Sequence, residues 1–86
     1  MTATKNTFVL LRQVEGPRWC VVRHALRDGK THFVDRLATA RAYPAAAQIA
    51  IESADRMGLI LAIQADGKRP RRFDPITDAP NVGGGR

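Results

Sequence analysis

Two tight-turn signals separate three β-prone segments in the first 35 residues, and this pattern constrains the fold more than any other feature of the sequence. Residues 7–11 and 18–24 are rich in large apolar and β-branched side chains, and Gly16-Pro17 lies between them. Asp28-Gly29 then precedes a third segment, residues 31–35. Both central residues of a type I′ turn need a positive φ, which Asp and Gly adopt readily. The sequence therefore predicts a three-stranded antiparallel meander.

After residue 43 the apolar spacing changes from that of a strand to that of a helix. Pro44 suits the first helical turn, where its missing N–H costs nothing. Gly58 stands where a left-handed residue would end the helix. Between them, apolar residues recur at spacings of three, one, three and three, which predicts an amphipathic helix. Its expected buried stripe consists of Ala47, Ala50, Ile51, Ala54 and Met57.

The remaining elements complete a two-layer fold. Residues 59–63 are apolar at every position, which indicates a strand buried on both faces. Asp66-Gly67 offers another turn, and residues 68–73 are expected to return as a ragged edge strand because Pro70 fits only at an edge. The predicted fold class is α+β: an antiparallel sheet with one helix on one face, in the order β-β-β-α-β, with room for a short final strand.

The chain length of 86 residues allows one domain. We assign it to residues 6–73, with a disordered N-terminus at residues 1–5 and a flexible tail at residues 74–86, where proline and a triple glycine gather. No stretch reaches the roughly 18 apolar residues of a membrane span, and no secretory signal is visible. With a single cysteine as well, we expect a cytoplasmic protein that does not bind membranes.

Four local features of the sequence occur in an order that is similar to a known family pattern. They are Trp19-x-Val21 after a turn, the Ala-rich helix ending at Gly58, residues 59–63, and Asp66-Gly67-Lys68. Together they resemble a family of short uncharacterised bacterial proteins that have no assigned activity. The element order is also similar to that of the HicB-like antitoxins, whose domain is a partial ribonuclease-H-type sandwich. The resemblance covers residues 18–73 and implies a bacterial α+β domain. The HicB-like relationship would imply a regulator that binds both a partner and DNA.

Neither catalytic nor metal-binding residues emerge from the sequence. Cys20 and His24 share a strand face, but four residues of rise separate them by about 13 Å. A two-residue second turn sets Phe33 opposite His24 and Ala25 opposite His32, so the two imidazoles point to opposite faces. We therefore predict no catalytic residue, no metal ligand and no cofactor, and the protein is not expected to be an enzyme.

The charge balance raises the question of a polyanionic partner. The chain has 14 Lys and Arg against 8 Asp and Glu, a formal net charge of +6. Four of these cations gather in residues 68–72, next to an aromatic side chain that could stack on a base. The alternative, which we favour, is a solvated edge strand whose charges and proline prevent sheet-to-sheet aggregation. The candidate polyanion-binding residues are Lys68, Arg69, Arg71, Arg72 and Phe73.

Apolar side chains are also more numerous than one helix can cover. Both faces of three predicted strands are apolar, and a second buried face usually means another layer or another subunit. Alternatively, residues 37–43 and 75–82 could cover it. The leading prediction is a non-catalytic protein-interaction or regulatory module with a protein partner or as a homodimer. The alternative is a nucleic-acid-binding module that uses residues 68–72, which we do not favour. The candidate interaction face is Phe8, Leu10, Trp19 and Val21.

Overall fold

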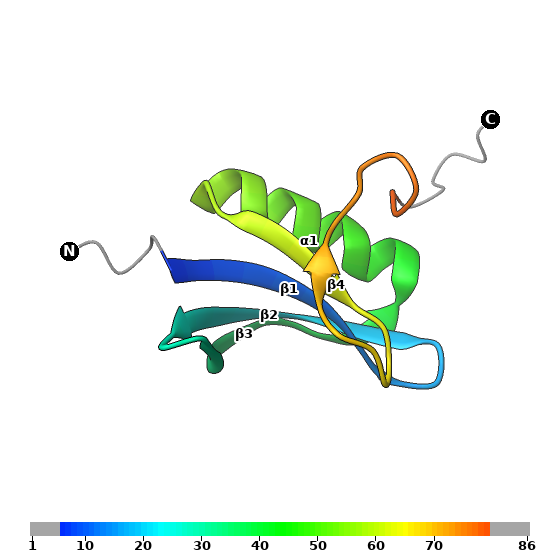
Figure 1. The fold of residues 1–86 in the computed structure, drawn as a ribbon. Helices are drawn as coiled ribbons and strands as arrows, with labels where there is room; N and C mark the ends of the chain where they lie inside the picture. Colours follow the sequence, from blue (N-terminus) through cyan, green and yellow to red (C-terminus); the bar gives the residue numbers. More distant parts are fainter. Residues whose placement is uncertain (1–5, 80–86) are drawn as a thin grey trace.

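The predicted meander forms the first three strands of a five-stranded sheet, on which a single helix packs (Figure 1). The computed structural model describes residues 6–79, so the prediction for residues 1–5 lies outside the described residues. The α+β class and the element order are confirmed. The elements are β1 (Thr7–Glu15), β2 (Arg18–Arg27), β3 (Lys30–Ala42), α1 (Tyr43–Met57), β4 (Ile60–Gln64) and β5 (Arg71–Arg72).

The turn between β2 and β3 has the geometry expected from its sequence. Asp28 and Gly29 have φ values of 54° and 75°, the left-handed conformation that this turn requires. The turn fixes the strand register, because His24 lies opposite Phe33 and Ala25 opposite His32. This register was the one predicted from the two-residue turn, and it is confirmed.

The strand order is β3-β2-β1-β4-β5, and one of its four strand pairs is parallel. β3 runs in the same direction as β1, because each pairs antiparallel with β2. The helix α1 then carries the chain back across the sheet, so that β4 enters beside β1 in the parallel sense. The sheet is therefore mixed rather than wholly antiparallel as predicted, and β1 lies at its centre between β2 and β4.

β3 is longer than the predicted segment of residues 31–35. It extends to Ala42 and pairs with β2 along its length, with three register shifts on the way. Residues 36–42 contain three alanines, which have little intrinsic preference for strands, so local sequence gave no strand signal there. Backbone pairing with β2 provides the structure instead. The alternative in which residues 37–43 form a loop that covers the second apolar face was therefore wrong.

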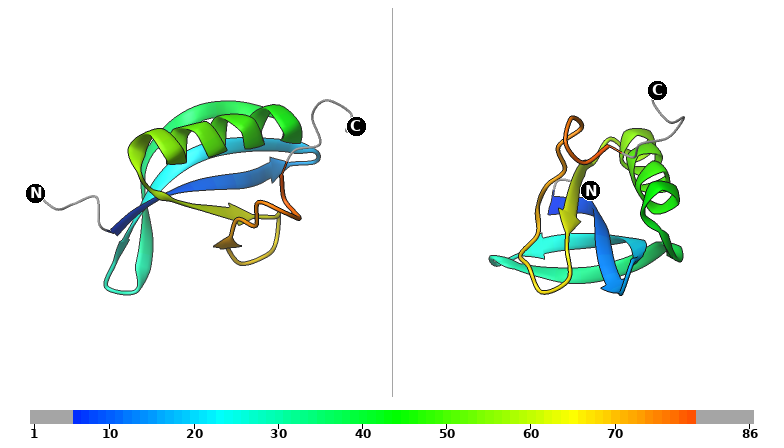
Figure 2. Two further views of the ribbon diagram at one scale, coloured as in Figure 1. Left: turned by 90° about the horizontal axis from the view of Figure 1, so that it is seen from above. Right: turned by 90° about the vertical axis from the view of Figure 1, so that its right-hand side faces the viewer.

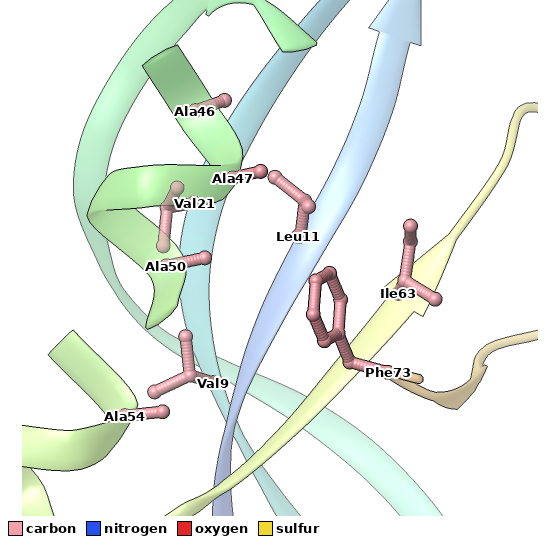
Figure 3. Packing of buried hydrophobic residues seen from close by; sticks show 9 residues of the cluster. All are labelled: Val9, Leu11, Val21, Ala46, Ala47, Ala50, Ala54, Ile63 and Phe73. Carbon is pink, nitrogen blue, oxygen red and sulfur yellow. The ribbon is translucent and has the colours of Figure 1, made fainter. Parts of the chain in front are cut away.

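The helix begins and ends where the sequence predicts. Gly58 follows it with a φ of 69°, and the Leu59 N–H donates to the Ala54 carbonyl at 2.9 Å. The side chains that it buries are small, so the helix lies close to the sheet. Figure 3 shows the resulting core, in which helix alanines face apolar residues of β1, β2 and β4 and the ring of Phe73. Its members are Val9, Leu11, Val21, Ala46, Ala47, Ala50, Ala54, Ile63 and Phe73.

The last two strands are shorter or more exposed than predicted. Ala62 and Ile63 are buried, but Ile60 is 53% exposed, so β4 is not buried on both faces along its whole length. β5 contains two residues, and Pro70 lies just outside it. The predicted edge strand at residues 68–73 is thus reduced to two residues in its C-terminal half, and β5 is an edge of the sheet as expected.

The segment after Phe73, predicted as the start of a flexible tail, is hydrogen-bonded as far as the structure describes it. The Asp78 N–H donates to the Asp74 carbonyl at 2.8 Å, and the Tyr43 hydroxyl donates to the Asp78 carbonyl. These bonds attach residues 74–78 to the N-terminal turn of α1. Residues 80–86, the rest of the predicted tail, lie outside the described part of the chain.

Candidate functional site

The candidate site is the face of the sheet that α1 leaves uncovered, here called the open face. Figure 2 shows the helix on one side of a strongly bent sheet, with the tip of the β2–β3 hairpin and β5 on the other side. An apolar floor lies on the open face of this bent sheet. The floor consists of Leu10, Cys20, Val22 and Ala62, with Phe8 packed against it.

Three rows of paired residues cross the open face from strand to strand. Residues directly opposite one another in paired strands have side chains on the same face. The strand register therefore places the members of each row side by side. The aromatic row contains Ile60, Phe8, His24 and Phe33. The central row contains Arg72, Ala62, Leu10, Val22 and Arg36, and the third row contains Gln64, Arg12 and Cys20.

The aromatic row places three rings in a line on three neighbouring strands. The Phe8 and His24 ring centroids are 6.0 Å apart, and those of His24 and Phe33 are 6.1 Å apart. The His24 ring stands edge-on to Phe33, at an interplanar angle of 88°. Phe33 is 60% exposed, which is unusual for a phenyl ring on a sheet that has a core. The row is therefore an aromatic surface that is accessible at its β3 end.

His24 lies between the two phenyl rings without a polar partner. Both of its ring nitrogens are buried, and neither makes a hydrogen bond. Burial lowers the pKa of His24, and the positive charge of Arg12 lowers it further. The imidazole is therefore neutral at physiological pH and retains one unused donor and one unused acceptor. Unpaired buried groups of this kind cost folding free energy and call for an explanation.

The charges on the three rows are all positive. Arg12, Arg36 and Arg72 stand in these rows, and none of the other row members is acidic. Within residues 6–79, no ion pair neutralises any of these three guanidinium groups. By contrast, Arg23 is paired with Asp35 at 2.9 Å on the helix side of the sheet. The open face is therefore a patch of uncompensated positive charge over an apolar floor.

A groove of about 400 Å³ runs along one end of the open face. Leu26 of the β2–β3 hairpin lines one part of it, and Ile60, Pro70 and Arg72 line the other. Phe8 contributes to the same groove. Leu26 and Ile60 are about half exposed, at 46% and 53%, so its walls are apolar and open to solvent. The size falls in the range of sites that hold small ligands or single side groups of a polymer.

The four residues predicted as an interaction face do not share a face. Phe8 and Leu10 belong to the open face, whereas Trp19 and Val21 lie under the helix. The physical reason is a β-bulge near Val14, which adds one residue to β1 just before the turn. A shift of one residue exchanges the two faces of a strand relative to its neighbour. The grouping was therefore wrong for Trp19 and Val21.

The predicted polyanion-binding segment is likewise divided by the structure. Phe73 is 8% exposed and packs in the core, so it cannot stack on a base (Figure 3). Arg71 donates two hydrogen bonds to the Asp78 carboxylate, at 2.7 and 2.8 Å. These bonds from Arg71 hold the pKa of Asp78 below its usual range. Arg72 points to the open face, apart from Lys68 and Arg69.

Lys68 and Arg69 instead border a second hollow, of about 640 Å³. Trp19 and Tyr43 line the same hollow and contact each other edge-to-face, with centroids 5.0 Å apart. Arg71 and Asp78 also line it. Here an acid neutralises part of the charge, and the aromatic rings are half-buried in the core. This hollow brings two exposed cations close to Trp19, although the sequence analysis assigned them to different sites.

The cysteine and the two histidines of residues 6–79 form no metal-binding group with the carboxylates. Cys20 is a buried free thiol in the apolar floor. Among the described residues, no group of three His, Cys, Asp or Glu side chains could hold a metal ion. The sequence analysis did not assign Arg12, Arg36 or Phe33 to a site. The register predicted from the second turn was the signal for Phe33, because it already placed this ring beside His24.

None of the helices in the described part of the chain is long and apolar enough to cross a membrane. Comparisons with protein-family models, with curated proteins and with solved structures found no match. The geometry of the open face is therefore the basis on which a function is assigned.

Proposed function

We propose that this protein is a non-catalytic interaction module whose ligand occupies the open face of the sheet. The observation that carries the proposal is the exposure of Leu26, Phe33 and Ile60 on one uncovered face. Large apolar side chains that gather on one face of a small domain usually mark a binding surface. His24, the titratable group of the aromatic row, has its ring nitrogens covered, which supports binding rather than acid–base chemistry.

The partner that this surface favours is a different molecule rather than a second copy of the chain. A symmetric dimer through the open face would bring the same patch of both copies together. Arg12, Arg36 and Arg72 would then face the arginines of the other copy, with no acid in the rows to compensate. Juxtaposed like charges at an interface cost several kcal/mol, on the order of the binding energy of a weak dimer. The charge pattern suits an anionic partner.

We further propose that the protein acts in the cytoplasm. Its cysteine is a buried free thiol, which is compatible with a reducing compartment. The HicB-like relationship also remains a proposal, and it would make one partner a protein. Either kind of partner is compatible with an interaction module that uses the open face.

The test is photo-crosslinking in the cells that carry the gene. A photoreactive p-benzoylphenylalanine replaces Phe33 in one variant and Gln48, on the exposed side of α1, in a matched control. We expect irradiation to attach a specific cellular macromolecule at position 33 and not at position 48. Equal adducts at both positions, or none at position 33, would refute the proposal.

A further inference from the structure

We propose that the open face binds single-stranded nucleic acid, with bases against the aromatic row and phosphates on the three arginines. This inference rests on the proposed function, since it names the ligand class of the same surface. It assigns the binding site to the sheet rather than to residues 68–72. Ring placement, unpaired charge, groove size and an unused hydrogen-bonding group support it.

The aromatic row provides the stacking surface. Phe8, His24 and Phe33 lie on three adjacent strands at regular spacings of 6.0 and 6.1 Å. Proteins that bind single strands place aromatic rings along a positively charged groove, where successive bases stack on them. Phe33 is the most accessible ring, and its exposure on a folded domain is explained if a base covers it in the complex.

The arginines provide the charge for the sugar–phosphate backbone. Arg12 lies on the central strand, and Arg36 and Arg72 lie on the two edge strands, so positive charge spans the width of the face. All three are exposed, and no acid within residues 6–79 pairs with them. A planar guanidinium can form two hydrogen bonds to one phosphate and can also stack on a base. Arginines around aromatic rings therefore match the alternation of phosphate and base in a single strand.

The groove and His24 provide a place for an extruded base. The groove of about 400 Å³ is lined by Phe8, Leu26 and Ile60, with Arg72 at its edge. Its apolar walls suit a base whose Watson–Crick edge is free to meet polar groups, which a duplex does not offer. Both His24 nitrogens lack hydrogen-bond partners in the described residues, and the edge of a bound base offers both a donor and an acceptor. Single strands, rather than duplexes, fit this combination.

The experiment measures the binding of the full chain to fluorescent oligonucleotides by anisotropy. The probes are single-stranded DNA and RNA of about twelve nucleotides, at about 50 mM salt, with a duplex of the same sequence for comparison. Phe33→Ser removes the exposed ring, and Val34→Ser is its control, because Val34 is 44% exposed and lines a different hollow with Arg23. Arg36→Gln removes one charge of the open face, and Arg69→Gln removes a cation outside it.

We expect Phe33→Ser to weaken binding of the single strand by about 5- to 150-fold, the loss that corresponds to one stacked base. Arg36→Gln should reduce the slope of log affinity against log salt by about 0.7, the value for one phosphate contact on a single strand. Val34→Ser and Arg69→Gln should leave the affinity and its salt dependence close to those of the wild type. Circular dichroism and the thermal midpoint check that each variant is folded.

Three outcomes would overturn the inference. One is failure of the wild type to bind either single strand at low salt. Another is a loss of oligonucleotide affinity with Arg69→Gln as large as that with Arg36→Gln, which would place the phosphate contact at the hollow beside Trp19. The last is preference for the duplex. A protein adduct at position 33, combined with no oligonucleotide binding, would refute this inference and leave the proposed interaction module standing.

Discussion

The two faces of the sheet bury apolar side chains in different ways. On the helix side, the alanines of α1 cover Val9, Leu11 and Val21, and the exposed fraction of each of these three side chains is 0%. On the open face, Leu10 and Val22 are nearly as buried, at 2% and 4%, although no helix of residues 6–79 packs over them. Phe8 packs against this floor, and the sheet curves around it. Burial on one face of a small sheet therefore does not require a second layer.

The arginines on the two sides of the sheet also differ, in whether they form ion pairs. Arg23 and Arg71, on the helix side, each form an ion pair with an aspartate. Arg12, Arg36 and Arg72, on the open face, form none within residues 6–79. Pairing fixes a side chain as part of the fold, whereas an unpaired cation around an apolar floor is free to meet a ligand. The helix side thus maintains the structure, whereas the open face carries the cations that our proposal assigns to binding.

The largest expected effect is a loss of stability caused by a substitution on the helix side of the sheet. Ala50→Asp places a charge at a helix position with 0% exposure, where it has no partner, and should cost several kcal/mol of unfolding free energy or prevent folding. Ala45→Asp is the control, since Ala45 is exposed in the first helical turn, where an acid is favourable. Urea denaturation compares the two variants. Similar midpoints would mean that α1 packs on the sheet by another face.

The second prediction compares one phenylalanine from each side. Phe73→Ala leaves a cavity in the core and should lower the free energy of unfolding by about 3–5 kcal/mol. Phe33→Ala removes a ring that is 60% exposed and should change it by about 0.5 kcal/mol or less. Chemical denaturation measures both changes. An equally large loss for Phe33→Ala would show that the open face, too, depends on its aromatic row for stability.

The smallest expected effect is the pH dependence contributed by His24. Its pKa is lowered in the folded state, so the unfolded chain binds more protons as the pH falls below about 6.5. The contribution of His24 is therefore most favourable above this pH and is lost as the pH falls toward the folded-state pKa. His24→Phe should reduce the decrease in stability between about pH 7.5 and pH 5.

The matched control for this pH effect is His32→Phe, which replaces the exposed histidine of β3. This variant should retain the decrease in stability seen in the wild type. Thermal denaturation at a series of pH values measures all three proteins. A wild-type stability that does not change between the two pH values would show that His24 is not desolvated in solution.

Local chemistry was sufficient to predict much of the fold. Asp28-Gly29 determined a turn and a register, and Pro44 and Gly58 marked the ends of a helix, because each of these residues restricts the backbone at its own position. The extension of β3 to Ala42 was not predictable in this way. It depends on hydrogen bonds to β2, and the sequence of the extension itself carries no strand preference.

The candidate site was predicted less well. The face on which a side chain lies depends on the number of residues between the paired positions of two strands, so one extra residue changes it. In β1 and β2, a two-residue turn without a bulge would have placed Phe8 and Leu10 on the same face as Trp19 and Val21. The bulge near Val14 reverses this relationship. Phe73 was missed for a similar reason, since its burial depends on how the chain returns along β4 rather than on its basic neighbours.

The position of β1 at the centre of the sheet has a consequence for the order of folding during synthesis. β1 leaves the ribosome first, and β2 and β3 can pair with it in turn, but its other edge stays open until β4 has been made. Phe8 then pairs with Ile60, a contact between distant parts of the chain that forms slowly. The nascent meander therefore exposes an unpaired strand edge and the apolar side of the sheet that α1 later covers, the kind of transient surface that makes a folding intermediate prone to aggregation.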